Sequence, residues 1–350
     1  MKIYENPLYL QDISHVAALD LPWEQLRGCS MLISGATGMI GSFLIDVLME
    51  KKLDLTIYAL GRNEEKARNR FARWWNDPCF VFVPCDINRG IPLEVESVDY
   101  AFHAASNTHP VAYATDPIGT ITTNIIGTDH LLSFAADHGT RRVLFASSVE
   151  VYGENRGDCE AFSENYCGYI DCNTMRAGYP ESKRAGEALC QAYISQKGLD
   201  VVIPRLARSY GPTLLMSDTK ALSQFIRKGV AGEDIVLKSA GTQLFSYTYV
   251  ADAVSGVLYC LFHGVKGEAY NIADSASDIT LRELAQIIAD CVGTKVVFDL
   301  PDATESAGFS KATKAIMESA KVRTLGWSAG YTMRSGLERT LRILKEDKEL

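Results

Sequence analysis

One short glycine-rich segment constrains the fold of this chain more than any other. Residues 31–34 form an apolar run, and residues 42–48 carry apolar side chains at helical spacing. Between them stand glycines at three-residue intervals, namely Gly35, Gly38 and Gly41. The pattern predicts a strand, a tight loop and a helix, in which the backbone and the helix N-terminus hold a pyrophosphate. A tight turn without a ligand is the alternative, because short glycine motifs also occur by chance.

The composition favours a globular protein with a small-molecule ligand. The chain has 350 residues, 47% of them hydrophobic, which is enough for one large domain or two modest ones. Its formal net charge of −8 offers no basic field, so neither nucleic acid nor a membrane is expected as a partner. No window approaches the roughly 18 apolar residues of a spanning helix, and the N-terminus lacks a signal-peptide pattern. We therefore expect a cytoplasmic protein.

The cysteines give no sign of disulfides or metal. There are nine, an odd number, and none forms a C-x-x-C pair, so reduced thiols are expected. Cys159, Cys167 and Cys172 cluster, but their spacing fits no zinc pattern. We expect no metal site.

Strand-like runs alternate with helical segments beyond the glycine loop. The further strands are predicted at residues 55–60, 80–86, 98–105, 142–148 and 201–206. A charged helix is expected after Gly61, through Arg73, and the two longest helices are expected at 118–138 and 179–196. This rhythm predicts an α/β fold, a Rossmann-type doubly wound parallel sheet with ligands at the carboxyl ends of its strands.

Changes in character along the chain suggest its division. Residues 1–28 carry enough apolar side chains for a docked N-terminal helical arm, to which no role is assigned. Residues 29–212, with returning segments near 240–275, are expected to form the dinucleotide-binding domain. Loop residues separate short elements beyond this point, and residues 213–350 are expected to form mainly a smaller C-terminal substrate-binding lobe.

Four residues suggest a catalytic site. Tyr179 and Lys183 stand four apart, on one face of a helix, where the cation is expected to favour the phenolate and make the tyrosine a base. Such a pair alone is common on helix surfaces. Ser148 and Glu150 come at the end of the fifth strand, where α/β sheets present functional side chains. Together they predict a catalytic group near the nicotinamide end of a dinucleotide.

In this order, the motifs resemble the extended short-chain dehydrogenase/reductases, the nucleotide-sugar epimerases, dehydratases and decarboxylases. The resemblance spans about residues 30–340. Besides the glycines and the catalytic group it rests on Asp86-Ile87, His103-Ala104-Ala105, Asn124 with Gly127-Thr128, Val151-Tyr152-Gly153, Arg205 with Tyr210-Gly211-Pro212, and Tyr249-Val250-Ala251-Asp252.

The resemblance implies specific roles and a homodimer built on the two long helices. The implied catalytic residues are Ser148, Glu150, Tyr179 and Lys183. The implied cofactor-binding residues are Gly35, Thr37, Gly38, Met39, Ile40, Gly41, Arg62, Asp86, Ile87, Ala104, Ala105, Asn124, Tyr179 and Lys183. The implied substrate-binding residues are Ser106, Arg176, Arg208 and Phe245.

Within the family, the motifs around Ser148 and Tyr179 are most similar to those of the UDP-glucuronate decarboxylases, with Glu150 before V-Y-G and Arg176 three before the tyrosine. The sugar 4,6-dehydratases carry an Asp-Glu pair where this chain has Val149-Glu150, so the usual acid for expelling the 6-hydroxyl is missing. Epimerases need only the serine, tyrosine and lysine, and stay open.

Three departures leave the nucleotide and the sugar open. The decarboxylases have an arginine that grips the diphosphate where this chain has Phe245, an asparagine at Arg208 and an arginine at Thr213. A lost arginine forfeits a bidentate phosphate contact, and Arg208 offers a cation from another direction.

The cofactor choice turns on the end of the second strand. NAD-preferring members place there an acidic residue that bonds the ribose 2′-hydroxyl, and this chain has Gly61 followed by Arg62. We therefore expect NADP in preference to NAD. The alternative is that Arg62 stacks on the adenine and that NAD binds.

The expected chemistry is redox-neutral. Tyr179, with Ser148 on the same oxygen, takes the proton of a sugar 4-hydroxyl while hydride leaves carbon 4 for the nicotinamide. The resulting 4-ketone permits decarboxylation at carbon 5 or proton transfer to Glu150, and return of the hydride closes the cycle. Glu150 paired with Arg176 in a structural role is the alternative for that residue. A 4,6-dehydratase, an NADPH-dependent carbonyl reductase and a non-catalytic dinucleotide sensor are the alternatives for the whole chain.

Overall fold

The computed structural model describes residues 2–108, 115–215, 217–299 and 313–347. Its centre is a parallel sheet in the order β11-β7-β5-β4-β1-β2-β3, with the short β6 beside β7. The strands are β1 (Ser30–Ser34), β2 (Thr56–Gly61), β3 (Phe80–Pro84), β4 (Tyr100–His103), β5 (Arg142–Phe145), β6 (Ser147–Ser148), β7 (Val201–Leu206) and β11 (Ala269–Ile272). The order reverses direction between β1 and β4, as in a doubly wound Rossmann sheet. The predicted fold class is confirmed.

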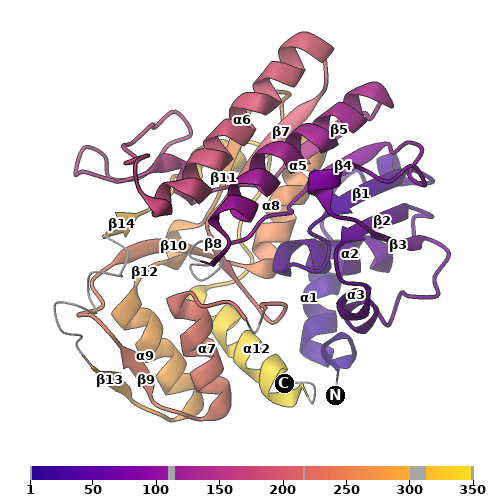
Figure 1. Ribbon diagram of the computed structural model, residues 1–350. Coiled ribbons are helices and arrows are strands. Elements are labelled where there is room, and N and C mark those ends of the chain that lie inside the picture. The colour runs from indigo at the N-terminus through magenta and orange to yellow at the C-terminus, as the bar shows by residue number, and fades with distance from the viewer. Residues whose placement is uncertain (1, 109–114, 216, 300–312, 348–350) are drawn as a thin grey trace.

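Helices cover both faces of this sheet (Figure 1). On one face α5 (Pro117–Asp137) and α6 (Gly178–Lys197) pack side by side. The other face carries α2 (Met39–Glu50) and α8 (Val250–His263), with α1 (Pro7–Ala17) packed against both. The short α3 (Glu64–Arg70) follows β2.

Strand β1 shows why its sequence is apolar throughout. Met31 and Ile33 belong to the core under α2 and α8, whereas Leu32 belongs to the core under α5 and α6. Each of the three is at most 1% exposed. A parallel strand covered on both faces has no polar side, so the run does not alternate.

Helix α1 ties the start of the chain to both halves of the molecule. The side chain of Asn6 caps it by accepting the N–H of Leu8 at 2.9 Å. The phenol of Tyr9 donates to Asp46 of α2 at 2.5 Å. On the next turn, Asp12 accepts the phenol of Tyr249 at 2.6 Å. Buried polar contacts therefore hold this helix in place.

The C-terminal part builds two small sheets beside the main one. In the larger, β10 (Leu244–Tyr249) pairs with β12 (Asp278–Thr280), β14 (Lys314–Ala315) and β8 (Arg208–Tyr210). In the smaller, β9 (Ile235–Leu237) pairs with β13 (Val296–Phe298). The helices of this part are α7 (Ala221–Ala231), α9 (Leu281–Val292), α11 (Ala320–Arg323) and α12 (Met333–Glu346). Of these, α7, α9 and α12 pack together at one end of the molecule (Figure 1).

Several predicted boundaries differ from the observed ones. The strand expected at 142–148 is divided at Ala146 into β5, which pairs with β4 and β7, and β6, which pairs with β7. The strand expected at 98–105 is limited to β4, and the charged helix ends at Arg70 rather than Arg73. The two long helices lie within one residue of their expected bounds. The remaining short 3-10 turns are η1 (Ile3–Glu5), η2 (Trp23–Leu26), η3 (Ile87–Arg89), η4 (Val149–Tyr152), η5 (Met175–Ala177) and η6 (Ser275–Ser277).

Candidate active site

The glycine loop folds tightly between β1 and α2. Gly35 has φ +70°, and a Cβ there would lie 2.6 Å from the carbonyl oxygen of Ala104. A Cβ on Gly41 would lie 2.6 Å from the carbonyl oxygen of Gly35. The N–H of Gly38 closes the turn by donating to that same carbonyl at 2.9 Å. The loop is a side-chain-free cradle at the carboxyl ends of β1 and β4, as a closely approaching pyrophosphate requires.

The other residues expected to hold a cofactor lie along the same sheet edge. Ala104 and Ala105 follow β4 directly, and their N–H groups donate to Ser34. Asp86 follows β3 and caps η3 by accepting the N–H of Asn88 at 3.1 Å. Ile87 is buried under α5, where a Cβ on Gly127 would meet it at 2.6 Å. Met39 and Ile40 begin α2.

Asn124 of α5 presents an unused acceptor. Its amide nitrogen donates to the hydroxyl of Ser182 on α6 at 2.9 Å. Its carbonyl oxygen is buried and has no hydrogen-bond partner within the described part of the chain. A buried acceptor without a donor is unfavourable in the protein alone and fits a site that a bound group completes.

Ser148, Tyr179 and Lys183 meet at the edge of the main sheet. Ser148 ends β6, beside Leu206 of β7, and its side chain hydrogen-bonds with the phenol of Tyr179 in the first turn of α6. Lys183 lies one turn further along and is 3% exposed. Its ammonium donates to the carbonyl of Ala146 at 2.8 Å. The three predicted residues are thus brought together.

The pKa values differ from the expectation that Lys183 makes the tyrosine acidic. Burial raises the pKa of Tyr179 to about 12, the hydrogen bond with Ser148 lowers it, and the charge of Glu150 raises it. Burial also lowers the pKa of Lys183 to about 8. Burial is therefore the largest cause of both shifts, and neither group is among the causes of the other's shift.

Glu150 pairs with Arg208 instead of the alternative partner Arg176. The carboxylate of Glu150 accepts from Nη2 of Arg208 at 3.3 Å. The guanidinium of Arg208 lies over the ring of Phe245, with its Cζ 3.8 Å from the ring centroid. Of the expected substrate-binding residues, Arg208 and Phe245 are therefore adjacent, and Arg176 stands in the exposed turn η5 just before Tyr179. Ser106, which lies shortly after β4, donates to the carbonyl of Asn107 at 3.1 Å.

The sequence interpretation missed Glu187, one turn after Lys183 on α6. Its carboxylate accepts the hydroxyl of Ser147 at 2.5 Å and Nη2 of Arg205 at 2.6 Å. This links the helix that carries Tyr179 to the strand that carries Ser148. The i, i+4 spacing from Lys183 is the signal that would have found it.

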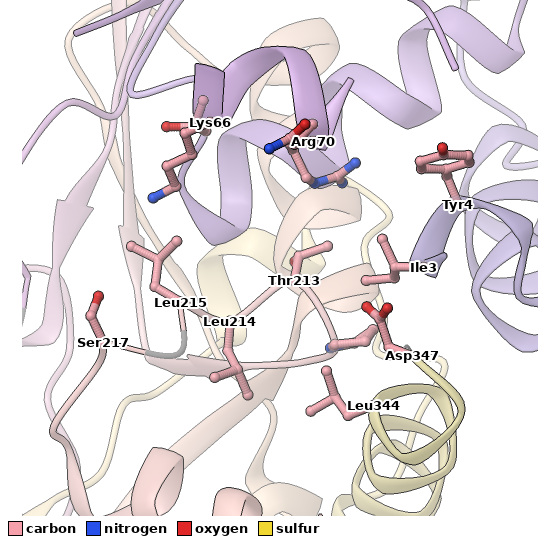
Figure 2. Close-up of a pocket in the computed structure, with 13 residues that line it drawn as sticks. Ile3, Tyr4, Lys66, Arg70, Thr213, Leu214, Leu215, Ser217, Leu344 and Asp347 are labelled. Atoms are coloured by element: carbon pink, nitrogen blue, oxygen red, sulfur yellow. The ribbon is translucent and has the colours of Figure 1, made fainter. Parts of the chain in front are cut away.

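Lys66 is a second missed residue, at the other end of the glycine loop. It lies on α3, at the rim of a cavity of about 310 Å³ that Thr37 and Thr213 also line. Figure 2 shows Lys66 and Arg70 on one side of this cavity, with Leu215 and Ser217 opposite Lys66. Partial burial of the ammonium and the neighbouring Arg62 lower the pKa of Lys66. Two cations therefore adjoin the end of β2, where the sequence already indicated that the usual carboxylate is replaced by Gly61.

Two negative findings apply to the part of the chain that the structure describes. No group of three or more histidine, cysteine, aspartate or glutamate side chains there is arranged to hold a metal ion. No helix there has the length and apolar character needed to cross a membrane.

Comparisons with known proteins agree with this geometry. The chain is similar to a UDP-glucuronic acid decarboxylase of Arabidopsis thaliana, with 31% identity over 91% of this chain and 89% of that protein. It is also similar to a solved dTDP-glucose 4,6-dehydratase of Streptomyces venezuelae with NAD bound, at 26% identity and a TM-score of 0.77, covering 91% of this chain and 98% of that one.

A UDP-glucuronic acid 4-epimerase of Bacillus cereus, solved with UDP-glucuronic acid and NAD, shares the fold at 22% identity and a TM-score of 0.78, covering 91% of this chain and 99% of that one. The model of the NAD dependent epimerase/dehydratase family matches residues 31–273. With a relative more than 30% identical over most of both chains, this match is decisive. The chain belongs to the NAD dependent epimerase/dehydratase family, as its motifs indicated.

Proposed function

We propose that this protein modifies a nucleotide sugar through a 4-keto intermediate, by decarboxylation or epimerisation and without net oxidation or reduction. The observation that carries the proposal is the contact of Ser148 with the buried phenol of Tyr179, with Lys183 one turn away and the glycine cradle on the same sheet edge. The similarity to a UDP-glucuronic acid decarboxylase supports the decarboxylation outcome.

Each residue has a distinct task in this proposal. The pKa of Tyr179 is raised in the cofactor-free structure, and the positive charge of a bound oxidised nicotinamide would favour its phenolate. As the phenolate, Tyr179 accepts the proton of the sugar 4-hydroxyl, and Ser148 hydrogen-bonds the same oxygen and holds it against the phenol oxygen. A bound nicotinamide supplies the acceptor, and later the donor, of one hydride at carbon 4. The 4-ketone of the sugar then stabilises negative charge at carbon 5, so a carboxylate there leaves as carbon dioxide, or Glu150 takes the carbon 5 proton. In either case the enolate that remains takes up a proton at carbon 5 before the hydride returns to carbon 4.

The residues around the glycine loop are proposed to hold the cofactor. The side-chain-free backbone of Gly35, Gly38 and Gly41 fits a pyrophosphate, and the unpaired oxygen of Asn124 fits a donor of the bound group. The family is described as NAD dependent, and within it we propose that this protein binds NADP in preference to NAD. The adjacent cations of Arg62 and Lys66 support it, because they suit a 2′-phosphate.

A specific observation disfavours 4,6-dehydration. Val149, which stands where the dehydratases carry an aspartate, is only 5% exposed and packs in the core. Glu150 is therefore the carboxylate next to Tyr179, and it is already paired with Arg208.

The assembly and location are proposed on other grounds. Exposed apolar side chains on α5, namely Ile118, Ile121, Ile125 and Ile126, support a homodimer formed by α5 and α6. The nine unpaired cysteines support a cytoplasmic location. The residues around Arg208 and Phe245, with the lobe beyond residue 213, are proposed to receive the sugar.

Replacement of Tyr179 tests the proposal. We expect Tyr179→Phe to lower conversion of UDP-glucuronate by about 10²- to 10⁴-fold, the usual value of a proton-transfer group. Its affinity for the cofactor, measured by calorimetry, should stay within a factor of about 2, because only one hydroxyl is removed.

Tyr193→Phe is the matched control. Tyr193 lies on the same helix, and the hydroxyl that the change removes donates to Asp129 at 2.7 Å. This variant should keep normal turnover. A Tyr179→Phe variant as active as the unmodified enzyme would refute the assignment.

A further inference from the structure

Two arginines near the end of β7 are held in different ways. Arg205 uses all its guanidinium nitrogens: Nε and Nη2 donate to Glu187 at 2.9 and 2.6 Å, and Nη1 donates to the phenol of Tyr152 at 3.0 Å. Arg208, three residues later, donates through Nη2 to Glu150, the one hydrogen bond of its side chain to the residues at 2–108, 115–215, 217–299 and 313–347. Its Nη1 is buried and has no hydrogen-bond partner among the residues that the structure describes. Arg205 therefore has a structural role, and Arg208 has an unused donor.

The surroundings of Arg208 keep that donor available. The ring of Phe245 covers the guanidinium but offers no acceptor, and on the backbone Arg208 pairs with Tyr247, another aromatic residue. A charged N–H that is removed from water and left without an acceptor is costly, so a site of this kind is completed by an anionic ligand.

Strand register places this donor beside the reacting centre. Ser148 of β6 pairs with Leu206 of β7, and two residues beyond each of them Glu150 and Arg208 form their ion pair. Glu150 is also close enough to Tyr179 for its charge to act on the phenol. Arg208 therefore lies next to the position of the sugar atom that Ser148 and Tyr179 hold.

We propose that Nη1 of Arg208 binds the carboxylate at carbon 5 of a nucleoside-diphosphate hexuronate and thereby selects a uronate over a neutral hexose. The inference rests on the proposed function, in which Ser148 and Tyr179 hold the oxygen on carbon 4. Carbon 5 is bonded to carbon 4, whereas the diphosphate is attached at carbon 1, on the opposite side of the sugar ring. The anion nearest the catalytic group is thus the carboxylate, and a guanidinium is well matched to it.

The test compares two ligands that differ only at carbon 5. UDP-glucuronate carries a carboxylate there, and UDP-glucose carries a hydroxymethyl group. Their affinities are measured by calorimetry in the cofactor-loaded protein, in a Tyr179→Phe background that prevents turnover. We expect Arg208→Ala to lower the affinity for UDP-glucuronate by about 10- to 100-fold and the affinity for UDP-glucose by less than about 3-fold. Arg208→Lys, which keeps the charge, should restore part of the lost affinity.

The matched control is Arg142→Ala. Arg142 is also a partly buried arginine in an ion pair, with Asp200 at 2.9 Å, but it stands at the start of β5, on the opposite edge of the sheet. It should leave both affinities unchanged, and thermal melting shows whether each variant is folded.

The outcomes separate the two proposals. Equal weakening of both ligands by Arg208→Ala overturns the inference, because it assigns Arg208 to the shared diphosphate or to support of Glu150. Unchanged binding of both ligands also overturns it. If the unmodified site binds neither UDP-glucuronate nor UDP-glucose, the inference and the proposed function fail together for uridine nucleotides.

Discussion

The two sides of the candidate site differ in how the chain forms them. On the cofactor side, the glycine loop is one continuous segment, and its shape follows from residues that lack side chains. On the substrate side, Glu150, Arg208 and Phe245 come from three separate elements and meet only through strand pairing. The cofactor side is shaped by the backbone of the glycine loop and suits any dinucleotide. The substrate side depends on the identity of the side chains that the three elements bring together. In our proposal, the first side therefore determines the class of cofactor and the second side determines the choice of sugar substrate.

The largest effect on the cofactor side is expected from Gly35→Ala. The new Cβ would lie 2.6 Å from the carbonyl of Ala104, so the loop must move away from β4. We expect cofactor affinity to fall by at least about 100-fold, equivalent to about 2.7 kcal/mol, in a binding titration.

Gly198→Ala is the control for backbone strain alone. Gly198 has nearly the same φ, +73°, but nothing lies within 4 Å of its missing Cβ. It should cost about 1–2 kcal/mol of stability and leave cofactor affinity unchanged. If both variants bind the cofactor equally well, the loop does not contact it.

A smaller effect is expected from the cations beyond β2. Replacing Arg62 and Lys66 together by serine should lower the ratio of NADP to NAD affinity by about 10- to 100-fold, because two charged contacts to a 2′-phosphate are lost. Arg68→Ser removes a cation of the same helix that already pairs with Glu64 at 2.9 Å, and should leave the ratio unchanged. Tighter binding of NAD than NADP by the unmodified protein would contradict the NADP preference.

The last effect concerns stability and the charge of Lys183, outside the contacts to either ligand. Burial lowers its pKa from the ordinary lysine value of 10.5 to about 8. Between these values the unfolded chain binds more protons, so this group makes the free energy of unfolding rise with pH across that window. Below about pH 8 the buried ammonium is a cost that Lys183→Met removes, and we expect that variant to gain roughly 1–3 kcal/mol at pH 7.

Urea unfolding of the cofactor-free protein measures this difference. The advantage of Lys183→Met should shrink between pH 8 and pH 10, and Lys197→Met, on the exposed end of the same helix, should show no such trend. A Lys183→Met variant that is less stable than the unmodified protein at pH 7 would show that the bond to Ala146 outweighs the cost of burial.

The sequence was informative where local spacing determines structure. The glycine intervals and the alternation of strands and helices predicted the Rossmann sheet. The meeting of Ser148 with Tyr179 was predicted from the place of Ser148 at the end of the fifth strand, where such a sheet presents its functional side chains. The pairing of Glu150 with Arg208 was not predicted, because it depends on the register between β6 and β7. The raised pKa of Tyr179 in the cofactor-free structure was not predicted, since a sequence shows the neighbouring charge but not the burial.

The most direct test of the central claim follows both the sugar and the cofactor during one reaction. The purified protein is given UDP-glucuronate in large excess over its bound cofactor, with none added. Sugar products are measured by mass spectrometry and the reduced nicotinamide by its absorbance. The account predicts many turnovers per protein with no steady accumulation or loss of the reduced cofactor. Conversion that stops after one turnover, or that consumes reduced cofactor in proportion to product, would contradict a redox-neutral enzyme.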